Sequence, residues 1–107
     1  MNYRVEFTPK SDSQMLKLRA FDQRRITVGI RDQLLAEPDV GTKNRKCLGY
    51  NVTTAFEFIP PLWELRIGSC RVFYEVDVSA QLVTIHSVLL KSGNLTTQEI
   101  LDEDNTG

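Results

Sequence analysis

A two-residue turn between two alternating segments constrains this chain more than any other feature of its sequence. Residues 63–67 alternate apolar and charged side chains, and an apolar pattern resumes over residues 70–76 after Gly68-Ser69. Glycine at the first of two turn positions is typical of the type II′ turn, which joins antiparallel strands tightly. Because such a turn sets the register, residues 66 and 71 are expected to face each other. The chain is therefore predicted to contain an antiparallel sheet built around this hairpin.

The sheet is expected to gain strands from segments on both sides of the hairpin. Residues 82–90 form a long, mostly apolar segment after a turn at residues 77–81, and residues 3–7 alternate as a half-buried strand does. We also expect a short strand at residues 55–59. The two prolines that follow it would end that strand, because proline cannot donate a ladder hydrogen bond.

Two consecutive helices are expected between the first strand and the hairpin. Thr8 followed by Pro9 predicts the N-cap and first residue of a short helix. The apolar side of this helix is formed by Met15, Leu16 and Leu18. Asp22 is the candidate N-cap of a second helix over residues 23–36, which Pro38 stops. The apolar stripe of the second helix consists of Ile26, Ile30 and Leu34. The order predicts an α+β fold, in which an N-terminal strand and a two-helix hairpin precede an antiparallel sheet of three or four strands.

The composition is that of one globular domain with an acidic end. The chain has 107 residues, of which 41% are hydrophobic and 25% charged. Four of its 14 acidic residues fall in the last nine positions, so the first 98 residues, with all 13 Lys and Arg and 10 acids, carry a net charge of +3. We predict one domain over residues 1–98 and an acidic tail over residues 99–107, with a short helical turn at residues 96–99. The mildly basic body suits either a polyanionic partner or an ordinary solvated surface.

Several kinds of chemistry are set aside by what the sequence lacks. Two cysteines, Cys47 and Cys70, and one histidine are too few for a four-ligand zinc site. We find no glycine-rich loop to hold phosphates, so no cofactor is expected. No apolar run is long enough to cross a membrane, and the first residues do not form a secretory signal. A cytoplasmic protein without a disulfide is therefore expected.

Arg66 and Arg71 are the first candidate site residues. If they face each other across the hairpin, their like charges destabilise it. One interpretation is that the two guanidiniums together hold a phosphate group, since arginine binds phosphate in a bidentate manner. The alternative is that Glu64 and Glu75 neutralise them as a surface charge ladder.

A second group of cations precedes the hairpin. Lys43, Arg45 and Lys46 fall within residues 40–50, which we expect to form a loop or an irregular edge of the sheet. These side chains would either bind phosphates through a sequence-independent electrostatic attraction or simply keep the loop solvated. Lys91 ends the last strand and would add one more cation if that end approaches the arginines.

The remaining polar and aromatic candidates are interpreted as structural. His86 lies within the last strand, where a buried, hydrogen-bonded role is favoured over that of a general base. By strand alternation it would share a face with Val88. Tyr74 and Trp63 are expected in the core.

The hairpin and two other segments of the sequence resemble those of a known family. Residues 63–76, WELRIGSCRVFYEV, are similar to the signature hairpin of the RelE/ParE toxins, whose pattern is Trp-x-Leu-Arg-x-Gly-x-x-Arg-Val-x-Tyr. Residues 42–46 resemble the Thr-x-Asn-Arg-Lys segment of one branch, and residues 3–9 resemble the first strand of the family. The resemblance extends over most of residues 3–94 and follows the same order of elements.

The resemblance implies a toxin of a type II toxin–antitoxin system. Such a protein is neutralised by a cognate antitoxin, and it meets operator DNA only through that antitoxin. RelE-like members cut mRNA on the ribosome without a metal, whereas ParE-like members act on DNA gyrase. The implied catalytic residues here are Arg66, Arg71 and Lys91. The implied RNA- and phosphate-binding residues are Lys43, Arg45 and Lys46.

The chain also departs from the family pattern. Active RelE-like nucleases usually carry a tyrosine or histidine near the C-terminus, and residues 92–107 contain neither. Glu64 stands where the family often has a cation, and residues 51–59 resemble an insertion. Three functions stay open, of which we favour a weak ribosome-dependent mRNA endoribonuclease. The others are a gyrase-binding toxin that does not cut RNA and a degenerate toxin that only binds its antitoxin.

Overall fold

The predicted hairpin lies in the middle of a five-stranded sheet. The computed structural model describes residues 2–106, and the strand order of its sheet is β1-β5-β4-β3-β2. The strands are β1 (Arg4–Phe7), β2 (Arg45–Gly49), β3 (Leu62–Ile67), β4 (Cys70–Asp77) and β5 (Leu82–Leu90). Four of them agree with the predicted strands to within one residue at each end. β1 pairs with β5 in parallel, which makes the sheet mixed, whereas all other pairs are antiparallel.

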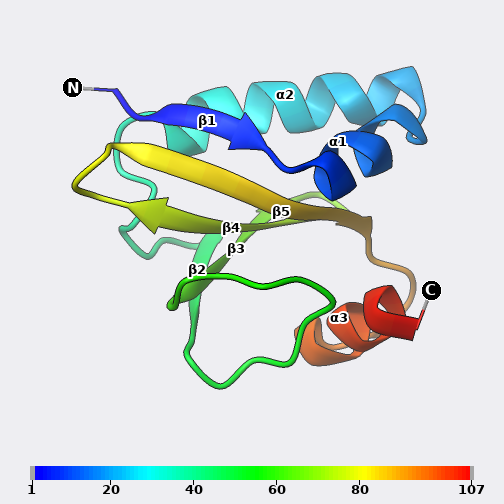
Figure 1. Ribbon diagram of the computed structural model, residues 1–107. Coiled ribbons are helices and arrows are strands. Elements are labelled where there is room, and N and C mark those ends of the chain that lie inside the picture. The colour runs from blue at the N-terminus through cyan, green and yellow to red at the C-terminus, as the bar shows by residue number, and fades with distance from the viewer. Residues whose placement is uncertain (1, 107) are drawn as a thin grey trace.

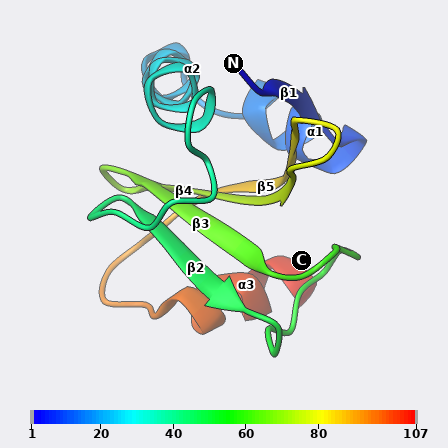
Figure 2. The same cartoon turned by 90° about the vertical axis from the view of Figure 1, so that its left-hand side faces the viewer.

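Helices cover both faces of this sheet. They are α1 (Pro9–Leu16), α2 (Ala20–Leu34) and α3 (Thr97–Thr106). Figures 1 and 2 show α1 and α2 on one face of the sheet and α3 on the opposite face. The predicted α+β fold class is therefore confirmed, and a third helix is added to it.

The turn has the geometry that its sequence predicts. Gly68 has a φ of +57°, and Arg66 pairs with Arg71 in the register set by this turn. Only glycine adopts such a φ without strain, so the turn and the register depend on this residue.

A large hydrophobic core lies between the sheet and the first two helices. Its fully or nearly fully buried members include Ile26, Ile30, Leu34, Trp63, Leu65, Val72, Tyr74, Val83 and Ile85. The predicted stripe of α2 and the predicted core positions of Trp63 and Tyr74 are confirmed. The Tyr74 hydroxyl donates a hydrogen bond of 2.7 Å to the Pro38 carbonyl, and burial raises the pKa of this phenol.

The start of α1 is as predicted, but the start of α2 is not. The Thr8 hydroxyl accepts a hydrogen bond of 3.2 Å from the Ser11 N–H and caps α1. The N-cap of α2 is Arg19 rather than Asp22, which lies within the first turn and is buried. Its carboxylate bonds Arg19 and Arg25, a position that the positive end of the helix favours. Leu16, expected on the apolar side of α1, is 75% exposed.

The segment before the hairpin differs from its prediction in one place. The expected strand at residues 55–59 is absent from the described structure, where residues 50–61 form a loop. Phe56 and Phe58 of this loop pack under the sheet instead of pairing with it. The basic segment forms β2, an edge strand with a register shift between Cys47 and Gly49. Of the two interpretations of this segment, the irregular edge is confirmed. Both cysteine thiols are free.

A bulge in β5 changes which side chains share a face. Phe73 pairs with Ser87 and Tyr74 with Ile85, so His86 is an extra residue without a partner in the ladder. The alternation of faces therefore shifts by one residue at this point. The prediction that His86 and Val88 share a face is wrong for this reason.

A second hydrophobic cluster lies under the opposite face and holds α3. Its buried members are Leu62, Phe73, Ile100 and Leu101. The helical turn predicted at residues 96–99 does begin a helix, because Thr96 and Glu99 form a capping box with N···O distances of 3.0 and 3.2 Å. The hydrogen bond from the Thr96 N–H lowers the pKa of Glu99. We expected the acidic residues to end this helix early, but α3 continues to Thr106.

We predict that Gly68→Ala destabilises the fold by about 1–3 kcal/mol, because alanine is strained at a positive φ. The Arg25 guanidinium would also have to move away from the new methyl group. Urea unfolding measures the change, and Ser69→Ala in the same turn is the matched control. Equal stability of the two variants would contradict the role of Gly68 in the turn.

Candidate functional site

Four cationic side chains from separate parts of the sheet surround one cavity. This cavity has a volume of about 240 Å³ and is lined by Lys46, Arg66, Arg71, Lys91, Leu95, Thr96, Thr97 and Ile100. Lys46 comes from β2, Arg66 from β3 and Arg71 from β4, and Lys91 follows β5. A hydrogen bond of 2.7 Å from the Lys91 N–H to the Ser69 carbonyl holds the end of β5 beside the hairpin turn. The structure thus brings together all three predicted catalytic residues and one of the predicted phosphate-binding residues.

The other two predicted phosphate-binding residues lie elsewhere. Arg45 donates to the carbonyls of Val40 and Gln33 at 2.9 and 2.6 Å, so it ties β2 to the C-terminal part of α2. Its neighbour Lys46 lies on the opposite face of β2, because side chains alternate along a strand. Lys43 is exposed, precedes β2 and does not line the cavity.

A buried carboxylate lies beside the two arginines. Glu64 is fully buried, and its Oε1 accepts a hydrogen bond of 3.0 Å from Arg66 Nε. Arg71 Nε lies 3.9 Å from Glu64 Oε2. The Arg71 Nη1 group donates to the Gly68 and Cys70 carbonyls at 2.7 and 2.9 Å, which fixes its side chain against the turn. The four cations and one carboxylate give the site a formal charge of +3.

Of the two carboxylates expected to neutralise the arginines, only Glu64 lies beside them. Glu64 contacts both guanidiniums, but Glu75 contacts His86 instead, with 2.5 Å between Glu75 Oε1 and His86 Nε2. His86 is 8% exposed and stacks on Phe56 with 5.0 Å between the ring centroids. Its structural interpretation is confirmed, and it does not line the cation cavity.

The first turn of α3 forms one wall of the cavity. The Thr97 hydroxyl donates a hydrogen bond of 2.8 Å to Glu64 Oε2, and Ile100 lines the same cavity. Sequence reasoning missed this wall because it assigned the acidic residues to a tail. The signal that pointed to a packed helix was the Ile100-Leu101 pair behind the Thr96–Glu99 capping pattern.

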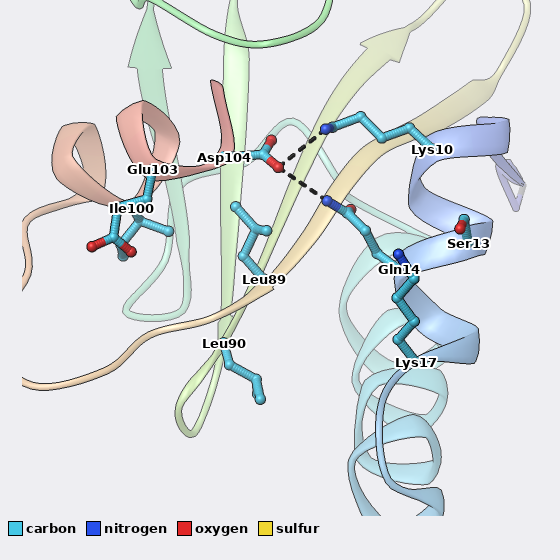
Figure 3. Close-up of a pocket in the computed structure, with 9 residues that line it drawn as sticks. All are labelled: Lys10, Ser13, Gln14, Lys17, Leu89, Leu90, Ile100, Glu103 and Asp104. Atoms are coloured by element: carbon cyan, nitrogen blue, oxygen red, sulfur yellow. Dashed lines mark hydrogen bonds and ion pairs between the residues drawn. The ribbon is translucent and has the colours of Figure 1, made fainter. Parts of the chain in front are cut away.

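A second cleft separates α3 from α1 on the other side of Ile100. It has a volume of about 400 Å³ and is drawn in Figure 3. Asp104 of α3 faces α1 there, and its Oδ1 accepts from Lys10 Nζ and Gln14 Nε2, both at 3.1 Å. The Ser87 hydroxyl of β5 donates to Asp104 Oδ2 at 3.0 Å. This Asp104 cluster fastens the C-terminal half of α3 to α1 and to the sheet.

Neither a metal-binding cluster nor a candidate membrane span is found in residues 2–106. No group of three or more His, Cys, Asp or Glu side chains in this range could hold a metal ion. No helix in this range is long and apolar enough to cross a membrane.

Comparison with known proteins gives matches among solved structures only. Neither a protein-family model nor a curated protein matches the sequence. A chain of the archaeal RelE–RelB complex from Pyrococcus horikoshii is similar over 89% of this chain and 100% of its own, with 25% identity and a TM-score of 0.66. This chain is therefore similar to RelE over most of its length. A chain of the RelBE2 toxin–antitoxin complex of Mycobacterium tuberculosis covers 85% of this chain and 100% of its own, with 22% identity and a TM-score of 0.65. The isolated Escherichia coli RelE toxin covers 94% and 97% at 14% identity, with a TM-score of 0.59, and shares the fold.

We predict that Asp104→Ala loosens α3. The change removes the carboxylate that accepts from Lys10 and Gln14, whereas the Ser87 hydroxyl keeps Gln14 Oε1 as an acceptor at 3.1 Å. Loss of these hydrogen bonds to a charged group costs about 1–3 kcal/mol. Hydrogen exchange of the amides of residues 100–104 is expected to accelerate, whereas Asp102→Ala, an exposed change on the same helix, is expected to leave it nearly unaltered. Unchanged exchange in Asp104→Ala would show that the cluster does not hold the helix.

Proposed function

We propose that this RelE-like chain is the toxin of a toxin–antitoxin pair and that it cuts mRNA on the ribosome. The observation that carries the proposal is the convergence of Lys46, Arg66, Arg71 and Lys91 on one cavity. Similarity to chains of RelE–RelB complexes supports an antitoxin as the partner protein. Contact with operator DNA would then run through that antitoxin.

The cation cavity suits the chemistry of a phosphodiester. Arginine guanidiniums orient a phosphate through paired N–H donors. In the transition state, negative charge grows on the oxygens around phosphorus, and donors already in place stabilise it without reorganising. Arg66 and Arg71 are the proposed phosphate clamps, and Lys46 and Lys91 supply additional positive charge. Lys43 is proposed to contact RNA outside the cavity, whereas the hydrogen bonds of Arg45 favour a structural role for it.

The proposal is tested by adding purified protein to a bacterial translation extract and mapping mRNA 5′ ends by primer extension. New ends inside translated codons are expected, and they should depend on ribosomes. Arg66→Ala is expected to reduce cleavage by roughly 100-fold, the usual effect of losing one transition-state donor. Arg31→Ala is the matched control, because the exposed Arg31 side chain of α2 forms its ion pair with the neighbouring Asp32. Intact mRNA at protein levels that arrest growth would refute the nuclease proposal.

A second candidate function is a toxin that does not cut RNA. Glu64 pairs with both arginines and α3 closes one side of the cavity, which favours a role in protein binding. Intact mRNA with inhibited gyrase supercoiling would support the gyrase-binding form of this candidate. A protein that leaves growth unaffected without its antitoxin would instead be a degenerate toxin.

A further inference from the structure

The proposed cleavage requires a group that accepts a proton. In a reaction without a metal, the ribose 2′-hydroxyl attacks phosphorus only as its proton is taken away. The cations of the cavity do not fill this role, because ammonium and guanidinium groups are hydrogen-bond donors without an acceptor. The residues after Lys91 include no tyrosine or histidine that could serve instead.

Glu64 is the carboxylate that contacts both arginines of the cavity, and a hydroxyl is already bound to it. Thr97 Oγ1 lies 2.8 Å from Glu64 Oε2 and donates to it. A general base must be 2.6–3.2 Å from the oxygen whose proton it takes, and this hydroxyl meets that condition. Thr97 also lines the cavity, whereas Glu64 does not and is fully buried, so Thr97 lies between the carboxylate and the space that a phosphate would fill.

We propose that Glu64 is the general base of the reaction and that the Thr97 hydroxyl occupies the place of the RNA 2′-hydroxyl. This inference rests on the proposed endonuclease function. Arg66 and Arg71 hold the carboxylate from two strands, and Lys46 pairs with Glu64 in the β2–β3 ladder. Lys91 approaches the same cavity from the end of β5. The carboxylate is thus oriented by the same side chains that would hold the phosphate.

The step balances as follows. The Glu64 carboxylate takes the proton of the 2′-hydroxyl, and the 2′-oxygen forms a bond to phosphorus. The bond from phosphorus to the 5′-oxygen breaks, and that oxygen takes a proton from water. The products are a 2′,3′-cyclic phosphate and a 5′-hydroxyl end. The hydroxide left in the water then removes the proton from Glu64.

The RNA hydroxyl has to displace Thr97 from the carboxylate. Thr97 is the first residue of α3, whereas the Asp104 cluster and the buried Leu101 lie further along the helix. Displacement therefore breaks one side-chain hydrogen bond and leaves the attachment of α3 intact. Thr97→Ala, which removes the competing hydroxyl and leaves its place open, is expected to raise the cleavage rate by about fivefold, the equivalent of one hydrogen bond.

The test is single-turnover cleavage of ribosome-bound mRNA between pH 6 and 8. Glu64→Gln is expected to slow cleavage by roughly 100-fold or more, and its remaining rate should rise about tenfold per pH unit, because hydroxide must replace the base. The wild-type rate is expected to be nearly flat, because the protein then supplies the base and hydroxide is not required. Glu64→Asp should regain part of the rate. Glu75→Gln, a change at a carboxylate that pairs with His86 away from the cavity, is the matched control.

The outcomes separate this inference from the proposed function. If the wild type cuts mRNA and Glu64→Gln cuts equally fast, or if the wild-type rate itself rises tenfold per pH unit, Glu64 is not the base although the nuclease proposal stands. A slow Glu64→Gln variant with wild-type pH dependence and weakened RNA binding would show a purely structural carboxylate. If Thr97→Ala is as slow as Glu64→Gln, the Thr97 hydroxyl is not a competitor. A wild type that leaves mRNA intact overturns both proposals together.

Discussion

The buried carboxylate of Glu64 is the interaction on which the cation surface of this protein depends. Two guanidiniums that face each other across adjacent strands repel, and a carboxylate removed from water is costly unless it is paired. In this sheet Glu64 lies beside both Arg66 and Arg71. The carboxylate reduces the repulsion between the guanidiniums, and the guanidiniums offset the cost of burying the carboxylate. The tight turn at Gly68 brings the two arginines opposite each other, and the carboxylate makes that register tolerable.

α3 connects this charged cluster to the rest of the fold. Its first residue contacts Glu64, its middle fills the second hydrophobic cluster through Ile100 and Leu101, and Asp104 bonds α1 and β5. The acidic end of the chain and its basic body are therefore parts of one packed unit. The acidic end of the sequence forms the helix α3, and the first turn of α3 lies against the basic cavity.

The fold of the chain and the chemistry of its cavity are separate properties. The likeness to RelE chains covers nearly the whole molecule. The hairpin contributes Arg66 and Arg71 to the cavity, and the Glu64 carboxylate is buried beside them. An arrangement with one proton acceptor among several donors differs chemically from a purely cationic surface. The chemical character of the cavity therefore follows from these residues and not from the fold alone.

The sequence by itself determined the hairpin, its register, the cap of α1 and the buried stripe of α2. Each of these follows from interactions within a few residues: the φ of Gly68, the hydroxyl of Thr8 and the spacing of Ile26 and Ile30. Only the tertiary structure decided which cations meet. Arg45 bonds α2 and Lys46 lines the cavity. Once β2 pairs with β3, its successive side chains lie on opposite faces of the sheet.

The same distinction explains the other differences. The bond from Thr97 to Glu64 joins positions 33 residues apart, and that from Ser87 to Asp104 joins positions 17 apart. No local pattern encodes such contacts, since they depend on how the second hydrophobic cluster packs. The bulge at His86 and the loop over residues 50–61 likewise arise where side chains fill the space under the sheet. Local chemistry set the elements of this protein, and the packing of distant segments set its site.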